Sequence, residues 1–392
     1  MEANLKIGPK VGYFNVVLAS FAHFCGDFYC NILPVLLPIF ALKYSFSYSQ
    51  CGLLYMIFQV TASFLQAPIG LYADKKNLGF ILPLSILTSG VLASCVGLTD
   101  SPVVLVIIIF LSGLCSSGFH PIAGGIIPHI SPKDKGVLST SIFIVGGNVG
   151  FAIAPFITAL YLEVFEVEQL AYLAIIPILT TVMVVIRRLH VKTWQPKPSE
   201  TLNLKIIFHN KSFLYLVASI GLRSVCYCAL VIYIPLLFTS RGISSVSASA
   251  ILMTMLIGTA VGGLVIGLIA HRFRMKTLII LSYVLTIAMM IVFLIKADDS
   301  ILSFICIFTA GFGLYGSTPV AIVLAQRLLP HADSFATSMM LGFTFGIGYI
   351  LSVFIGILAD FVGLHEALSI FIFPSLILAI LTVLKVNTVK AV

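Results

Sequence analysis

The 392-residue sequence predicts an all-α integral membrane protein with twelve transmembrane helices in two pseudo-symmetric six-helix bundles. Hydrophobic residues make up 60% of the chain and charged residues only 9%, whereas a soluble domain carries about 25% charged residues. Apolar runs long enough to cross a bilayer, which takes about 20 residues, follow one another along the whole chain. A pattern of glycines and prolines in the first half also returns in the second half.

Each apolar run predicts one membrane-spanning helix. The runs are nearly continuous and rich in Leu, Ile, Phe, Gly and Ala, unlike the ~10-residue alternation of barrel strands. The first run lacks the cleavage site of a signal peptide, so we expect it to be retained. The predicted spans are 13–42, 48–73, 78–98, 102–130, 136–162, 168–187, 212–239, 245–270, 277–296, 300–328, 334–359 and 365–385.

The basic residues predict that both termini lie in the cytoplasm. With the N-terminus inside, eighteen of the 22 Lys and Arg residues fall in cytoplasmic segments. Only Lys43, Arg241 and Lys296 fall outside, and Arg223 lies within a span, in agreement with the positive-inside rule. The net charge of +8 is thereby explained by topology, so no nucleic-acid partner is expected.

No cofactor or metal is expected. The eight cysteines lie in or beside apolar helices, and the pair Cys226 and Cys228 would point to different helix faces, which makes a poor metal site. A Walker phosphate loop, which ATP-driven pumping would need, is missing from the sequence. An enzyme is disfavoured because the sequence offers no nucleophile–base pair.

The first span carries a polar stripe. His23, Asp27 and Asn31 are four residues apart and therefore share one helix face. A charge at mid-bilayer costs at least ~2.5–3.5 kcal/mol, so such residues normally face a bundle interior or a wet cavity. Pro34 and Pro38 follow and should bend this helix.

The second span ends in residues that are candidates for controlling the change of conformation. Gly70 permits close helix approach, and Asp74 beside Lys75 at the cytoplasmic rim can lock one conformation through a charge network. Earlier in the span, Gln59 and Gln66 share a face. They either contact substrate or hydrogen-bond neighbouring helices.

The fourth span carries a candidate substrate-binding residue, and the fifth span carries candidate helix-packing residues. His120 lies in the apolar stretch 113–130 with no charge near it in the sequence. In the fifth span Gly146 and Gly150 are four apart, before Pro155, and small residues at this spacing let two backbones pack closely. We therefore expect helices 4 and 5 to cross near His120.

The second half repeats the first. Residues 190–210 form the extended polar stretch, which predicts a linker between bundles at 1–189 and 211–392. The repeated positions are Gly113, Gly118 and Pro121, which return as Gly311, Gly316 and Pro319. The second half adds its own polar residues, namely the buried cation Arg223 with Tyr227 in helix 7, and Tyr315 and Thr318 in helix 10.

These motifs resemble the major facilitator superfamily, whose loop between helices 2 and 3 carries Gly-x-x-x-Asp-Arg/Lys. Gly70, Asp74 and Lys75 match it, although Asn77 replaces the usual following Gly and His271 replaces the Asp in the second copy. Over nearly its full length the chain resembles the fosmidomycin-resistance branch. The similar blocks are AHFCGD at 22–27, FQVTASFLQAPIGLYAD at 58–74, GLCSSGFHP at 113–121, SIFIVGGNVGFAIAP at 141–155 and LLPHADSFATSMMLGFTFGIG at 328–348.

The resemblance implies a secondary transporter with a cavity lined by helices 1, 4, 7 and 10 and with alternating access. It implies a location in the plasma membrane, the inner membrane of bacteria, with a small-molecule substrate, protons and lipid as partners. We expect a monomer. Family members often follow His-Pro with an acidic and a basic residue, whereas this chain has Ile122 and Gly125, so fosmidomycin itself is not inferred as the substrate.

We therefore predict three groups of functional residues. Asp27 and His23 carry the proton, although His23 could merely hold helix 1 in place. His120 and Arg223 contact substrate, with packing and a structural ion pair as their alternatives. The full substrate-binding set is His120, Arg223, Asn31, Gln59, Tyr227, Tyr315 and Thr318, and the conformational set is Gly70, Asp74, Lys75, Gly146, Gly150 and Pro155.

The predicted function is proton-coupled efflux, by antiport, of a small drug or metabolite that can be anionic. The family resemblance favours this direction, as does the Gly-rich fifth span ending in Pro155, which is similar to an antiporter motif. Proton-coupled uptake of a small organic anion or siderophore is the alternative. A channel or a membrane receptor is least favoured, because ionisable residues divided between two repeats indicate a carrier.

Overall fold

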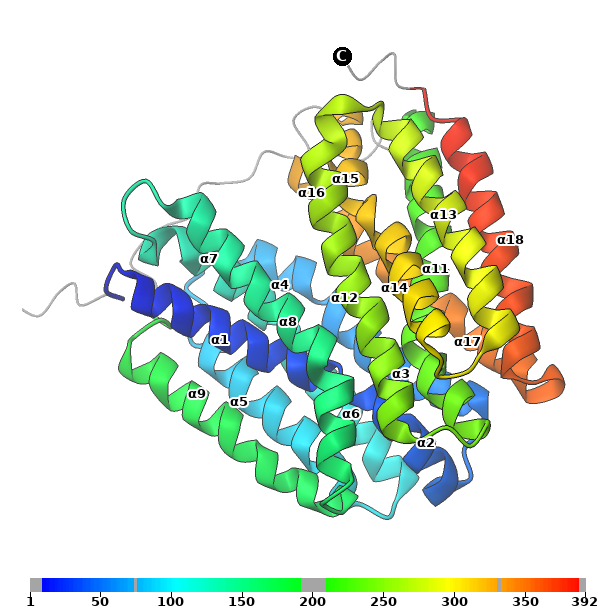
Figure 1. Ribbon diagram of the computed structural model, residues 1–392. Coiled ribbons are helices and arrows are strands. Elements are labelled where there is room, and N and C mark those ends of the chain that lie inside the picture. The colour runs from blue at the N-terminus through cyan, green and yellow to red at the C-terminus, as the bar shows by residue number, and fades with distance from the viewer. Residues whose placement is uncertain (1–8, 74–75, 192–208, 330–332, 388–392) are drawn as a thin grey trace, which may run out of the picture. The chain divides into compact units, whose positions relative to one another are not determined.

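The computed structural model describes residues 9–73, 76–191, 209–329 and 333–387, and the regular elements in these ranges are all helices (Figure 1). Within them, 12 helical segments are long and apolar enough to cross a membrane. Each span starts and ends within about three residues of its predicted position, because uninterrupted apolar length decides where a helix can cross a bilayer.

The spans comprise the following helices. They are α1 (Tyr13–Cys30), α2 (Leu33–Tyr44), α3 (Tyr48–Phe64), α4 (Gln66–Ala73), α5 (Ile81–Ser94), α6 (Pro102–Ser116), α7 (Phe119–Ile130), α8 (Gly136–Leu162), α9 (Ile175–Ile186), α11 (Lys211–Ser240), α12 (Ser245–Ile269), α13 (Met275–Lys296), α14 (Ile301–Gly316), α15 (Thr318–Leu328), α16 (Asp333–Ser338), α17 (Thr344–Val362) and α18 (Leu364–Leu384).

Helix 1 is broken in its middle, where the sequence predicted a bend. The first part, α1, ends at Cys30, and α2 begins at Leu33. Pro34 has no N–H, and its ring would clash with the carbonyl of Cys30 in a continuous helix. The Asn31 N–H instead donates to the Phe28 carbonyl at 3.1 Å.

Helices 4 and 10 are broken at matching places of the repeat. In helix 4, α6 ends at Ser116 and α7 begins at Phe119; in helix 10, α14 ends at Gly316 and α15 begins at Thr318. A repeated proline lies in the first turn after each break, where a missing N–H costs nothing. The repeated glycines and prolines therefore mark the same local structure in both halves.

Contacts divide the chain into two compact units. One comprises the residues up to Leu33 and those from Ile57 to the linker, and the other comprises Pro34–Met56 and the residues after the linker. The predicted bundles differ from these units in the placement of residues 34–56. The bundle boundaries at 189 and 211 stay a prediction.

In the first unit, α1 packs along α8 and also contacts α5, α7 and α9. A Cβ atom on Gly146 would meet the backbone of Ser20, and one on Gly150 would meet the backbone of Phe24. The two glycines thus serve the contact between helices 1 and 5. Helices 4 and 5 do touch, through α7 and α8, but the prediction that these glycines bring them together is wrong, because the glycines lie on the face of α8 that is turned toward α1.

In the second unit, α11 is the central helix. It packs against α17, α18 and α12, and 94% of the residues in its most apolar 18-residue stretch are buried. α12 and α14 approach closely, because Gly258 and Gly262 lie directly against the carbonyl groups of Phe308 and Phe312. Because other helices of the unit surround α11, its buried side chains, including Arg223, contact those helices.

The start of α3 is capped by a carboxylate from α17. Asp360 accepts hydrogen bonds from the backbone N–H groups of Tyr48 at 2.7 Å and Ser49 at 3.3 Å. The helices are close here because Gly356 has no side chain: a Cβ there would lie 2.8 Å from the Tyr48 carbonyl oxygen and from the Ser49 Cα. Negative charge at a helix N-terminus is stabilising.

Replacing Asp360 by Ala should therefore destabilise the second unit. The cap is worth about 1 kcal/mol, so we expect a lower melting temperature in mild detergent. Asp299→Ala, in the exposed loop before α14, is the matched control and should melt like the native chain. Equal melting of the Asp360 and Asp299 variants would show that the cap contributes nothing.

Candidate functional site

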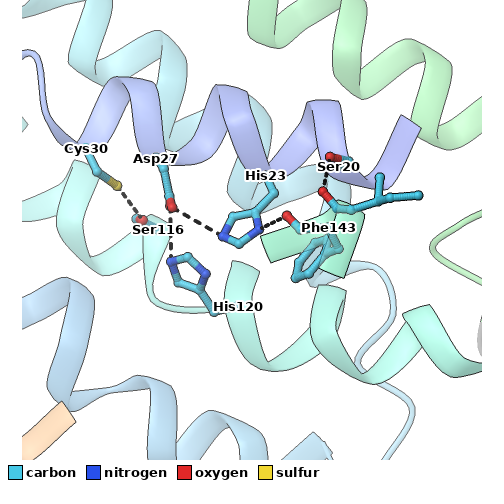
Figure 2. Close-up of polar contacts among 8 residues, drawn as sticks. Ser20, His23, Asp27, Cys30, Ser116, His120 and Phe143 are labelled. Atoms are coloured by element: carbon cyan, nitrogen blue, oxygen red, sulfur yellow. Dashed lines mark hydrogen bonds and ion pairs between the residues drawn. The ribbon is translucent and has the colours of Figure 1, made fainter. Parts of the chain in front are cut away.

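The candidate site is a cluster around Asp27 in the last turn of α1 (Figure 2). Asp27 Oδ2 lies 3.2 Å from His23 Nε2, one turn earlier on the same helix. Asp27 Oδ1 lies 3.5 Å from His120 Nε2, which comes from α7. The stripe predicted on helix 1 thus faces a histidine from helix 4, which the spacing within one helix could not reveal.

The tautomer of His23 follows from its partners. Its Nδ1 lies 2.8 Å from the carbonyl oxygen of Phe143 in α8. A carbonyl only accepts hydrogen bonds, so Nδ1 carries the hydrogen and the neutral ring has a lone pair at Nε2. This lone pair faces an oxygen of the Asp27 carboxylate, which is also an acceptor.

The His23–Asp27 contact therefore requires a proton. Without one, the acceptor atoms His23 Nε2 and Asp27 Oδ2 face each other at 3.2 Å, so neither satisfies the other, and such a contact is unfavourable where little water reaches it. With one proton on either partner, the same contact becomes a charge-assisted or neutral hydrogen bond. The geometry thus distinguishes two states of the site that differ by a single proton.

His120 is the most accessible member of the cluster. Its side chain is 32% exposed, compared with 16% for Asp27 and 10% for His23. It lies in the first turn of α7, directly after the break in helix 4. Its ring meets that of His23 edge to face, with 5.1 Å between centroids. His120 is therefore the member of the cluster that is most open to its surroundings.

The cluster also has residue types that ligate metals. One nitrogen of each histidine and one Asp27 oxygen lie within 4.8 Å of one another, so the three could surround a metal ion. The expected absence of a metal stays a prediction. Metal analysis of the purified protein would check it.

A second polar cluster surrounds Arg223 in α11, whose side chain is 0% exposed. Its Nη1 donates to the Leu314 carbonyl at 3.1 Å and to Thr318 Oγ1 at 3.0 Å, and its Nη2 donates to Ser224 Oγ at 3.3 Å. The buried Nε–H has no hydrogen-bond partner among the residues that the structure describes. Within the described ranges no ion pair is found for this guanidinium, so the structural carboxylate considered as an alternative for it is not seen there.

Aromatic rings cover the guanidinium. Its central carbon lies 5.1 Å from the ring centroid of Tyr315 and 5.6 Å from that of Phe345. Tyr227 contacts both rings, with centroid distances of 5.7 Å and 5.4 Å. Four predicted substrate-binding residues, namely Arg223, Tyr227, Tyr315 and Thr318, therefore gather in one place. Sequence reasoning missed Phe345, because an apolar residue in an apolar span carries no signal.

The remaining predicted substrate-binding residues lie elsewhere. Asn31 donates from Nδ2 to the Phe151 carbonyl of α8 at 2.7 Å and so connects helices 1 and 5. Gln59 is buried in α3.

The predicted conformational residues are only partly visible. A Cβ on Gly70 in α4 would contact Pro121 of α7 at 3.4 Å, so this glycine lies beside helix 4. Asp74 and Lys75 lie outside the described residues. Pro155 lies inside α8, which continues through it from Gly136 to Leu162.

Comparisons with known proteins agree with this architecture. Residues 17–353 match the family model described as the Major Facilitator Superfamily. The chain is 26% identical over 379 residues to the "Uncharacterized MFS-type transporter YfnC" of Bacillus subtilis (strain 168), covering 92% of this chain and 89% of the relative. It is 24% identical over 376 residues to the fosmidomycin resistance protein of Escherichia coli (strain K12), covering 91% and 89%.

Solved structures show the same fold at low sequence identity. The nucleoside transporter NupG matches with a TM-score of 0.74 and 18% identity, over 95% of this chain and 99% of that one. A bacterial homolog of the human lysosomal transporter Spinster, in an inward-facing and occupied conformation, matches with a TM-score of 0.72 and 16% identity, over 97% and 95%.

Proposed function

The chain belongs to the Major Facilitator Superfamily of secondary transporters, and from this premise we propose that it couples small-molecule transport to proton movement by alternating access. The family, the twelve-span fold and the expectation of a transporter instead of an enzyme, all indicated by the sequence, are confirmed. The protein is a multi-pass membrane protein. The driving ion, the direction and the substrate are the subject of the proposal.

Proton coupling rests on the contact between His23 and Asp27. The Phe143 carbonyl holds the imidazole so that Nε2 faces the carboxylate, and this contact is satisfied only when a proton is present. His120 gives the pair a partly exposed neighbour, through which a proton can arrive and leave. A titratable group that is buried but accessible from one side is what a proton-driven carrier needs.

The surroundings of Arg223 support an anionic substrate. A buried guanidinium without a carboxylate partner is costly, and the cost falls when a bound anion supplies the missing charge. Arg223 has an Nε–H without a hydrogen-bond partner among the described residues, and the rings of Tyr315 and Phe345 lie close to its guanidinium. We therefore favour a small drug or metabolite with an acidic group.

We propose efflux by antiport as the direction. One full-length relative is named a fosmidomycin resistance protein, and the Gly-rich α8 supports the same direction. Because this chain has Ile122 and Gly125 where family members often have an acidic and a basic residue, fosmidomycin itself is not inferred as the substrate. Uptake of a small organic anion or siderophore would use the same Asp27 and Arg223 clusters and is the second candidate. A channel or receptor is least favoured.

Topology and assembly complete the proposal. We propose that both termini are cytoplasmic, that the protein resides in the bacterial inner membrane and that it works as a monomer. Conformational roles are proposed for Gly70, Asp74, Lys75 and Pro155, together with the glycines that pack α8 on α1.

Transport by purified protein in liposomes tests the proposal. Candidate substrates would come from growth of deletion and overexpression strains on a panel of antibiotics and iron sources. We expect counterflow, which a carrier shows and a channel does not, and accumulation that depends on an imposed pH gradient and disappears with a protonophore. Flux without counterflow would overturn the carrier mechanism, and accumulation indifferent to the pH gradient would overturn proton coupling.

A further inference from the structure

Gly147 of α8 lies directly against the His23–Asp27 pair. A Cβ atom at this position would lie 2.6 Å from Asp27 Oδ2 and 2.5 Å from His23 Cε1, and would also overlap His23 Nε2. Real Cβ atoms essentially never come within 3.0 Å of another heavy atom. Even one methyl group at residue 147 would therefore displace at least one member of the pair.

The neighbouring glycines of α8 have a different environment. A Cβ on Gly146 would meet Ser20, mainly its backbone, and one on Gly150 would meet the backbone of Phe24. Those contacts are ordinary close packing of two helices. At Gly147 the nearest atoms belong to the two side chains that share the proton.

α8 constrains His23 at two positions one turn apart. The carbonyl of Phe143 holds Nδ1 at 2.8 Å, and Gly147, four residues later on the same face, leaves room for Nε2 to reach Asp27. The hydrogen bond to Phe143 restricts how far the ring can move away from a side chain at 147. The backbone of α8 thus determines both the tautomer of His23 and its distance from Asp27.

We propose that Gly147 is a positioning residue, whose missing side chain sets the contact through which His23 and Asp27 share a proton. This inference rests on the proposed proton coupling. Among the described residues, the other titratable groups near the pair are His120 from α7 and the Cys30 thiol of α1, while α6 contributes the Ser116 hydroxyl near Cys30. None of these groups reaches the contact from the side of α8.

The test is the variant Gly147→Ala in the full-length chain, and the quantity measured is the binding of a proton by His23. Histidine NMR signals of isotope-labelled protein would be followed against pH, and the His23 signal would be assigned by its loss in His23→Asn. A longer distance to the Asp27 carboxylate should move the midpoint of the His23 imidazolium titration to lower pH. We expect a shift of about one pH unit, which is tenfold in proton affinity.

Two further variants make the result specific. Gly125→Ala in α7, where a Cβ meets nothing within 4 Å, should leave the titration unchanged. Substituting His23 by Ala removes the two nearest atoms that a methyl group at 147 would overlap, and it leaves the Asp27 carboxylate oxygen free to move into the vacated space. If Gly147→Ala folds poorly, the double variant Gly147→Ala/His23→Ala should therefore recover the melting temperature of His23→Ala alone.

The outcomes separate the two proposals. An unchanged His23 titration in folded Gly147→Ala, or a double variant that stays as unstable as Gly147→Ala, would overturn the role of Gly147. Proton coupling itself fails on a different measurement, namely native transport that ignores the pH gradient. A shifted titration together with gradient-driven native transport supports both.

Discussion

Asp27→Asn should abolish transport driven by a pH gradient. An amide is nearly the size of a carboxylate and can donate from Nδ2 to the Nε2 lone pair of His23, so the contact is satisfied without a titrating proton. A gradient of one pH unit supports about tenfold accumulation per coupled proton, and the variant should lose all of it. The measurement is accumulation in liposomes with an imposed pH gradient.

Counterflow distinguishes lost coupling from lost function in this experiment. Asp27→Asn should still exchange substrate at equal pH on both sides, because the substrate site proposed around Arg223 is untouched. Asp298→Asn is the matched control: hydrogen bonds from the Ser300 and Ser303 hydroxyls lower the pKa of Asp298 to about 2, so this loop carboxylate stays charged at neutral pH. Gradient-driven transport by Asp27→Asn at the native level would contradict the assignment.

Arg223→Gln should weaken transport of anionic substrates much more than transport of neutral ones. Hydrogen bonds to a charged group contribute about 1.5–3 kcal/mol, which corresponds to roughly 10–150-fold in apparent affinity. Arg223→Lys retains the charge but loses the planar fork, so its loss should be intermediate. The measurement is KM for a pair of related substrates with and without the acidic group.

Stability has to be followed in parallel for the Arg223 variants. The guanidinium also binds the Leu314 carbonyl and the Thr318 hydroxyl, so a melting curve should accompany each KM. Arg241→Gln is the control, because Arg241 follows α11 and donates to the Ala297 carbonyl. Equal losses for anionic and neutral substrates would show that Arg223 is structural.

The sequence predicted the spans well because bilayer thickness imposes a length on every apolar run. It also placed His23 and Asp27 on one face, since their spacing is that of a helical turn. It could not predict that His120 approaches Asp27, because contacts between helices depend on packing. The sequence could not predict the role of Phe143 either, because the group that holds His23 is its backbone carbonyl, which every residue has.

The glycines of α8 show which part of a helix contact a sequence pattern cannot predict. Small residues four apart correctly indicated a close helix contact, but the spacing does not say which helix is the partner. Gly146 and Gly150 meet α1, and Gly147, between them, was not singled out. A missing side chain has no chemistry of its own, so its importance appears only when its neighbours are known.

The matched breaks in helices 4 and 10 have a consequence for how such a protein can evolve. In each half, the first turn after the break meets a charged residue of a central helix: His120 meets Asp27, and Thr318 meets Arg223. A duplicated ancestor would have had two equal sites, whereas here the proposed proton site lies in one copy and the proposed anion site in the other. Mutations around Thr318 could therefore retune which compounds are recognised while the energy source in the other copy is left intact.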